Sequence, residues 1–158
     1  MPLPTMNTPT FRVKLHSLPN EVEFRPFLVK EEKILILAQE SNEPKEMIKA
    51  MQDIVTSCSN GNVQGRDLPF FDLQYAFIQL RSQSIGSVTD FVLICGECGH
   101  KTETTLDLNS LTIDFPENHT NKIMLSDAVG VIMKYPKAEI LVKTFSLSGR
   151  SSDARAVN

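Results

Sequence analysis

A chain of 158 residues is about the length of one domain, and its composition of 41% hydrophobic and 22% charged residues is that of a folded globular protein. The formal net charge of −3, with Lys and Arg scattered along the chain, argues against a protein that binds nucleic acid through a basic surface. The sequence contains neither an apolar run of about 18 residues nor the cationic and apolar regions of a secretory signal. We therefore expect no membrane segment and a cytosolic location during synthesis.

The N-terminal part of the chain is rich in proline and then alternates in polarity. Several prolines among small polar residues predict an extended N-terminal arm over residues 1–10. Residues 11–15 alternate apolar with basic side chains, which is typical of a half-buried strand, and EVEFRPFLV (residues 21–29) predicts a second extended segment. These segments begin a single domain that we expect to span residues 11–145.

Three segments have the pattern of helices. KEEKILILAQES (residues 30–41) combines helix-forming residues with acidic side chains in its first turn. Residues 44–58 begin with Pro44, which suits the first position of a helix, and residues 71–85 carry apolar side chains three to four apart before Gly86. The apolar face of the second of these helices is formed by Met47, Ile48, Met51, Ile54, Val55 and Cys58.

The C-terminal half has the pattern of short strands. SVTDFVLIC (residues 87–95) and KTETTLDL (residues 101–108) predict two strands of a hairpin whose turn is GECGH. Further short apolar runs follow up to residue 136, and residues 146–158 are polar and predict a disordered tail. The fold class expected is α+β, with a helical N-terminal half of about three helices packed with a small, mainly antiparallel sheet that carries the C-x-x-C hairpin.

The cysteine turn invites several interpretations. A thioredoxin-type redox pair would start a helix, whereas strand-like residues follow here, and covalent haem attachment is excluded because Gly99 separates Cys98 from His100. The two interpretations that remain are a metal-free turn and a zinc knuckle, in which the thiolates of Cys95 and Cys98 bind one structural zinc ion. The sequence leaves both open.

A structural zinc site requires four ligands, and the chain has no second C-x-x-C. The candidates to complete it are Cys58 and His100, with His16 and His119 as weaker ones. Cys58 lies on the apolar face of a predicted helix, where a cysteine is more simply a small buried hydrophobe. An odd number of cysteines without a secretory signal argues against a disulfide framework.

Motifs of catalysis are absent from the sequence: it has no glycine-rich phosphate loop, no G-x-S-x-G and no H-E-x-x-H. The serines stand in no recognisable nucleophile context. We therefore expect no catalytic residues and a protein that is not an enzyme.

Several long phrases of the sequence resemble one family. They occur in the order EFRPFLVKEEKILILAQES, PKEMIKAMQDIV, DLPFFDLQYAFIQLRSQSIG and FPENHTNKIMLSDAVGVIMKYP, and the resemblance extends over residues 11–136. The family is that of the baseplate hub assembly proteins of T-even-like tailed bacteriophages. The resemblance also covers the cysteine pair Cys95 and Cys98, since family members tend to have one near this hairpin.

The resemblance implies a non-enzymatic late viral protein that helps to build the central hub of the tail baseplate. Its partners would be other hub and tail proteins, with self-association a further expectation, and its location the host cytoplasm during assembly or the baseplate of the virion. Candidate anchors for these contacts, if they are not core residues, are Phe24, Phe27, Phe70 and Phe71. The alternative is a small zinc-ribbon-like regulatory factor that binds nucleic acid or the transcription machinery.

Overall fold

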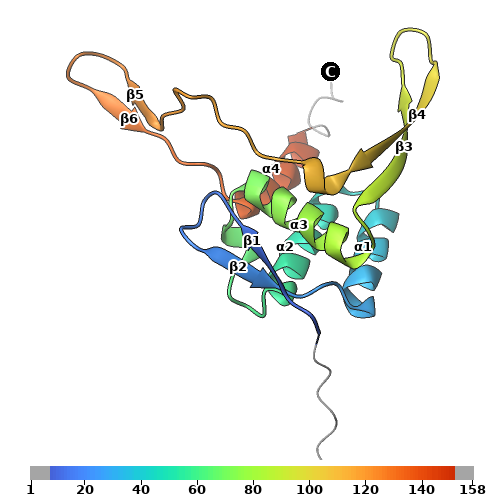
Figure 1. Cartoon of the computed structure of the whole chain (residues 1–158). Helices are drawn as coiled ribbons and strands as arrows, with labels where there is room; N and C mark the ends of the chain where they lie inside the picture. Colours follow the sequence, from blue (N-terminus) through green and yellow to red (C-terminus); the bar gives the residue numbers. More distant parts are fainter. Residues whose placement is uncertain (1–7, 152–158) are drawn as a thin grey trace, which may run out of the picture.

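The computed structural model describes residues 8–151. Figure 1 shows a central group of helices, with one strand pair against it and two strand pairs that project from it in different directions. The elements in chain order are β1 (Phe11–Lys14), β2 (Glu21–Phe24), α1 (Val29–Glu40), α2 (Pro44–Cys58), η1 (Gly65–Asp67), α3 (Phe70–Ser84), β3 (Val88–Ile94), β4 (Lys101–Asp107), η2 (Leu108–Ser110), β5 (Lys122–Met124), β6 (Gly130–Ile132) and α4 (Ala138–Ser151).

The α+β class agrees with these helices and small antiparallel sheets, but the expectation of one small sheet is wrong. Within the described residues each strand pairs only with its neighbour in the chain, as β1–β2, β3–β4 and β5–β6. The predicted strands of residues 87–108 do pair with each other, and they add no third strand. Of the strands in the described residues, only β1 and β2 bury side chains in the hydrophobic core, so β3–β6 share no core face on which to join one sheet.

The hydrophobic core lies between the helices, with α2 in contact with α1, α3 and α4. The apolar face predicted for α2 is confirmed, because Ile48, Ile54 and Val55 are buried there. Leu73, Ala76 and Leu80 bury the matching face of α3. Burying such side chains contributes roughly 1.5–3 kcal/mol each, so the packing of α2 on α3 is a large stabilising contribution to the fold.

The three predicted helices are confirmed to within a few residues, and the structure adds a fourth. Helix α4 packs Ala138, Leu141 and Val142 against the core, and the backbone N–H of Ala138 donates to the carbonyl of Leu68 at 2.9 Å. It continues to Ser151, so residues 146–151 of the expected tail are helical. Residues 1–7 of the expected N-terminal arm and residues 152–158 of the tail lie outside the described residues.

A buried ion pair joins the end of β2 to α1 and α2. The carboxylate of Glu31 accepts hydrogen bonds from the Arg25 guanidinium at 2.8 Å, the Ser57 hydroxyl at 2.9 Å and the backbone N–H of Leu28 at 2.9 Å. Burial alone would raise the pKa of Glu31, but these donors outweigh it and lower the pKa to about 2. Glu31 is thus charged at neutral pH and fixes the start of α1.

None of the helices in the described part of the chain combines the length and the apolar character needed to cross a bilayer.

Candidate functional site: the cysteine turn and the projecting arms

The cysteine turn connects β3 to β4 over residues 95–100. The ladder of paired residues ends at Ile94 and Lys101, so Cys95 and Cys98 stand beyond the strands, in the connection itself. The backbone N–H of Cys95 donates to the carbonyl of His100 at 2.9 Å, and that of Gly99 donates to the carbonyl of Cys95 at 2.9 Å. Gly99 has a φ of 68°, in the left-handed region that glycine adopts without steric cost, and this closes the turn.

Both cysteines of the turn are exposed free thiols. The pKa of Cys95 is lowered because the backbone N–H groups of Cys98 and Glu97, and the thiol of Cys98, form hydrogen bonds to its sulfur. A lower pKa increases the share of thiolate, which is the form that binds metals and acts as a nucleophile. Thiolates bind soft cations such as zinc, and the zinc interpretation of this turn stays a prediction.

The structure does not gather the other candidate zinc ligands at this turn. Cys58 is fully buried at the end of α2, where burial raises the pKa of its thiol to about 11, as suits a small core hydrophobe. His100 is exposed, and its backbone carbonyl is occupied by Cys95. Within the described residues, no group of three or more His, Cys, Asp and Glu side chains is placed to hold a metal ion.

His16 and His119 belong instead to an aromatic cluster beside α3. The His119 ring stacks on Tyr135 with ring centroids 5.8 Å apart and contacts its hydroxyl group, while His16 and His119 both lie against Phe115. Phe71 of α3 packs edge-on against Tyr135 at 4.8 Å. The cluster holds the segments on either side of β5–β6 to the helical body; its members are His16, Phe71, Tyr75, Phe115, His119 and Tyr135.

The strand pair β3–β4 and its connecting turn project from the helices, and we call residues 87–108 the β3–β4 arm (Figure 1). Successive residues of a strand point to opposite faces, so Phe91 and Leu93 lie on one face and Val92 and Ile94 on the other. All four are exposed, Ile94 by 65%. A strand with apolar side chains on both faces and no covering layer is typical of a surface that binds a partner.

The second projecting strand pair is equally apolar, and we call residues 121–133 the β5–β6 arm (Figure 1). Ile123 pairs with Val131 and Met124 with Gly130. Its exposed large hydrophobic residues, with Ile132 reaching 69% exposure, are Ile123, Met124, Leu125, Val129, Val131, Ile132 and Met133. Single exposed hydrophobic residues are common on protein surfaces, but a contiguous group of this size indicates an interaction site.

Each arm is closed at its base by a backbone hydrogen bond. In the β3–β4 arm the N–H of Leu108 donates to the carbonyl of Ser87 at 2.8 Å, and in the β5–β6 arm the N–H of Met133 donates to the carbonyl of Asn121 at 2.7 Å. The Ser82 hydroxyl also donates to the side-chain oxygen of Asn109 at 2.7 Å, which ties η2 to α3. The arms are thus fixed at the body and uncovered towards their tips.

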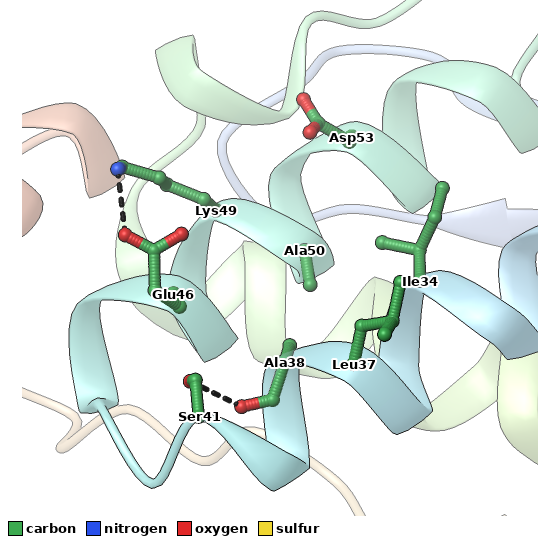
Figure 2. A pocket seen from close by; sticks show the side chains of 8 residues that line it. All are labelled: Ile34, Leu37, Ala38, Ser41, Glu46, Lys49, Ala50 and Asp53. Atoms are coloured by element: carbon green, nitrogen blue, oxygen red, sulfur yellow. Dashed lines mark hydrogen bonds and ion pairs between the residues drawn. The ribbon is translucent and has the colours of Figure 1, made fainter.

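A shallow groove of about 290 Å³ lies between α1 and α2. Its floor is apolar, formed by Ile34, Leu37, Ala38 and Ala50, and Figure 2 shows the Glu46–Lys49 ion pair (2.9 Å) at its rim. An apolar floor with a charged, solvated rim is suited to binding an apolar side chain of a partner protein and lacks the convergent polar groups of an active site.

The four phenylalanines considered as interface anchors have other positions. Phe24 is fully buried, Phe27 packs on Phe77 with centroids 5.9 Å apart, and Phe70 is packed against the core. Phe71 belongs to the aromatic cluster. The exposed residues of the arms were not identified from the sequence, although the unbroken apolar run FVLI (residues 91–94) is a signal for them, since a half-buried strand would alternate.

A protein-family model described as T4 bacteriophage base plate protein matches residues 6–155, which is most of the chain. No curated protein and no solved structure matches the chain significantly.

Proposed function

We propose that this chain, which belongs to the T4 bacteriophage base plate protein family, acts without catalysis in building the central hub of the phage tail baseplate. Membership of the family makes it a phage baseplate protein whose partners are other phage tail proteins. A role at the central hub is a more specific proposal, and it is supported by the resemblance of residues 11–136 to hub assembly proteins. The host cytoplasm, where baseplates are assembled, is the corresponding location.

The observation that carries a contact function is the apolar surface of the two arms. A two-stranded sheet is marginally stable in water, and one that exposes apolar side chains on its faces gains most from a partner that covers them. The helical body beneath the arms has a core of its own, so it would present the arms to partners in fixed positions. Protein contacts of this kind need no active site, in keeping with the non-enzymatic function.

The test compares one exposed residue of each arm with a matched position on α1. Ile132→Asp and Leu93→Asp each place a charge on an exposed apolar site, and Gln39→Glu adds the same charge to an exposed polar site. We expect all three purified variants to keep the wild-type circular dichroism spectrum. In phage that depend on the variant copy, at least one arm variant should reduce the yield of complete baseplates more than tenfold, with Gln39→Glu unaffected.

The measurements are sedimentation of baseplate intermediates and co-purification of this chain with other tail proteins. Wild-type incorporation of both arm variants would contradict the proposal. A salt-dependent affinity of the purified chain for DNA or RNA would favour the zinc-ribbon-like regulatory factor instead, but the net charge of −3 predicts no such affinity.

A further inference from the structure

We propose that Cys95 and Cys98 are one half of a zinc site, which a second copy of this chain completes with its own Cys95 and Cys98. The ion would join the tips of two β3–β4 arms and make the chain a zinc-bridged dimer. This inference does not rest on the proposed role at the baseplate hub.

The turn already has the geometry of a two-thiolate ligand. Its backbone is closed by the hydrogen bond from Gly99 to Cys95 at 2.9 Å and by the left-handed Gly99, so both cysteines are held in one tight turn. Fixing the backbone of both ligands in advance lowers the ordering cost of binding, so this half-site is preorganised before any ion arrives.

The coordination number of zinc calls for ligands from outside the chain. Structural zinc sites hold four protein ligands in a tetrahedron, and this turn supplies two. Cys58 is buried, and His16 and His119 are in the aromatic cluster. Since no third ligand is grouped with the pair anywhere in residues 8–151, a closed site requires a second chain.

A second copy is the partner that meets this requirement with the fewest assumptions. A two-fold axis through the ion repeats the same pair of thiolates, and two pairs give a Cys₄ site. The same axis would bring one exposed apolar face beside the turn, that of Val92 and Ile94, together with its counterpart. Burying them offsets the marginal stability of a free two-stranded arm, so metal binding and apolar association act in the same direction.

The binding step is a substitution of protons by the metal ion. Each thiol loses its proton to solvent as its sulfur binds Zn²⁺, so up to four protons are released for each ion bound by two chains. No oxidation or reduction is involved, and a reductant keeps the thiols available.

The test is a titration of the full chain with Zn²⁺ under reducing conditions, followed by light scattering and zinc analysis. We expect one zinc ion per two chains, a doubling of the molecular mass on binding, and a return to the monomer when a chelator removes the ion. Co²⁺ used as a spectroscopic substitute should give the intense visible bands and the sulfur charge-transfer bands of a tetrahedral all-thiolate site.

Cys95→Ser and Cys98→Ser should each abolish zinc-dependent dimer formation while leaving the circular dichroism spectrum unchanged, because both side chains are exposed. His100→Ala is the matched control in the same turn, and it should keep the stoichiometry and the mass change. One zinc ion per monomer without a mass change, loss of binding in His100→Ala, no zinc binding, or a dimer that persists in both serine variants would each overturn the proposal.

Discussion

Glu31 is a residue on which three elements depend. Its carboxylate is enclosed by Arg25 from the end of β2, Ser57 from α2 and the backbone at the start of α1. A buried ion pair costs a large desolvation energy, and it is kept only when hydrogen bonds satisfy both partners, as they do here. Removing one partner therefore destabilises the fold by more than the pair contributes to it, because the other charge is left buried without a counter-charge.

We expect Glu31→Gln to lower the free energy of unfolding by about 3 kcal/mol, because the buried Arg25 guanidinium loses its counter-charge. Urea unfolding followed by circular dichroism measures this. Glu32→Gln, at an exposed position of the same turn, is the control and should change stability by less than about 0.5 kcal/mol. Equal stability of the two variants would show that the pair contributes nothing net.

The same residue predicts a pH dependence. The folded pKa of Glu31, about 2, lies below its ordinary value of 4.5, so the folded state favours the charged carboxylate. This contribution is complete above pH 4.5 and is lost as the pH falls towards 2, by up to about 3 kcal/mol. Between pH 6 and pH 2.5, the free energy of unfolding should fall more steeply with pH for wild type than for Glu31→Gln. The same pH dependence in both proteins would contradict a stabilising charge on Glu31.

Gly65 is a position where the backbone leaves no room for a side chain. A Cβ placed there would lie 2.4 Å from the carbonyl oxygen of Gln52, so the new methyl group would clash with backbone, which cannot rotate away as a side chain can. We expect Gly65→Ala to destabilise the fold by roughly 2–3 kcal/mol in thermal or urea unfolding. Gly96→Ala is the control, since nothing lies within 4 Å of its Cβ position, and a comparable loss there would refute the steric explanation.

At the scale of elements, the arms and the helical body differ in what holds them. Helix α2 is enclosed by α1, α3 and α4, whereas β3 and β4 contact mainly each other. Regions with few buried apolar contacts open locally at low free energy.

We therefore predict a steep difference in amide hydrogen exchange. In the metal-free chain, amides of residues 92–95 and 99–102 should be protected by no more than about tenfold, because an isolated two-stranded ladder is marginally stable. Ile54 and Val55 of α2 are buried and should exchange only through global unfolding. Equal protection of both sets, measured by NMR, would mean that the arm is part of the core.

The elements differ in how well the sequence predicts them, and the reason is where each obtains its stability. The apolar face of α2 recurs with the helical period and is buried as that pattern requires, so local sequence and tertiary packing agree. Helix α4 was missed because its packing against the core through Leu141 and Val142 depends on a contact distant in sequence, the bridge between Pro69 and Lys137.

The candidate site shows the same division. The turn around Cys95 and Cys98 is closed by local contacts, the backbone hydrogen bonds of Cys95 and Gly99, so it depends on residues that are near in sequence. The neighbouring sequence does not predict the positions of His16 and His119, because ring contacts with Phe115 determine them. Alternation of apolar and polar residues likewise predicts strands but not which strands pair, because the pairing depends on the packing of the whole chain.

At the scale of the whole molecule, the body should fold without the β5–β6 arm. Asn121 and Met133 are hydrogen-bonded at 2.7 Å, so a short Gly–Ser linker can replace residues 122–132 without moving the ends. We expect the free energy of unfolding to change by less than about 1 kcal/mol, since the deleted side chains are exposed. Co-purification with other tail proteins should fall at least as far as it does for Ile132→Asp.

A helix variant provides the comparison for that deletion. Leu141→Ala in α4 removes a side chain packed against the core and should cost roughly 2 kcal/mol, which shows that the assay detects core damage. A deletion that destabilises more than Leu141→Ala would show that the arm and the body form one cooperative unit.

The length of the β3–β4 arm has a mechanical consequence. Strand β3 has 7 residues, which at about 3.3 Å each amount to a lever of roughly 23 Å. Its base is tied to α3 by two side-chain hydrogen bonds, Ser82 to Asn109 and Arg81 to Thr89. A rotation of about 10° at this base displaces the tip by about 4 Å, comparable to the spacing of neighbouring strands. A partner that holds the tip to within about 4 Å therefore limits the rotation of the helical body about the base to about 10°, so a distant contact sets the orientation of the whole molecule.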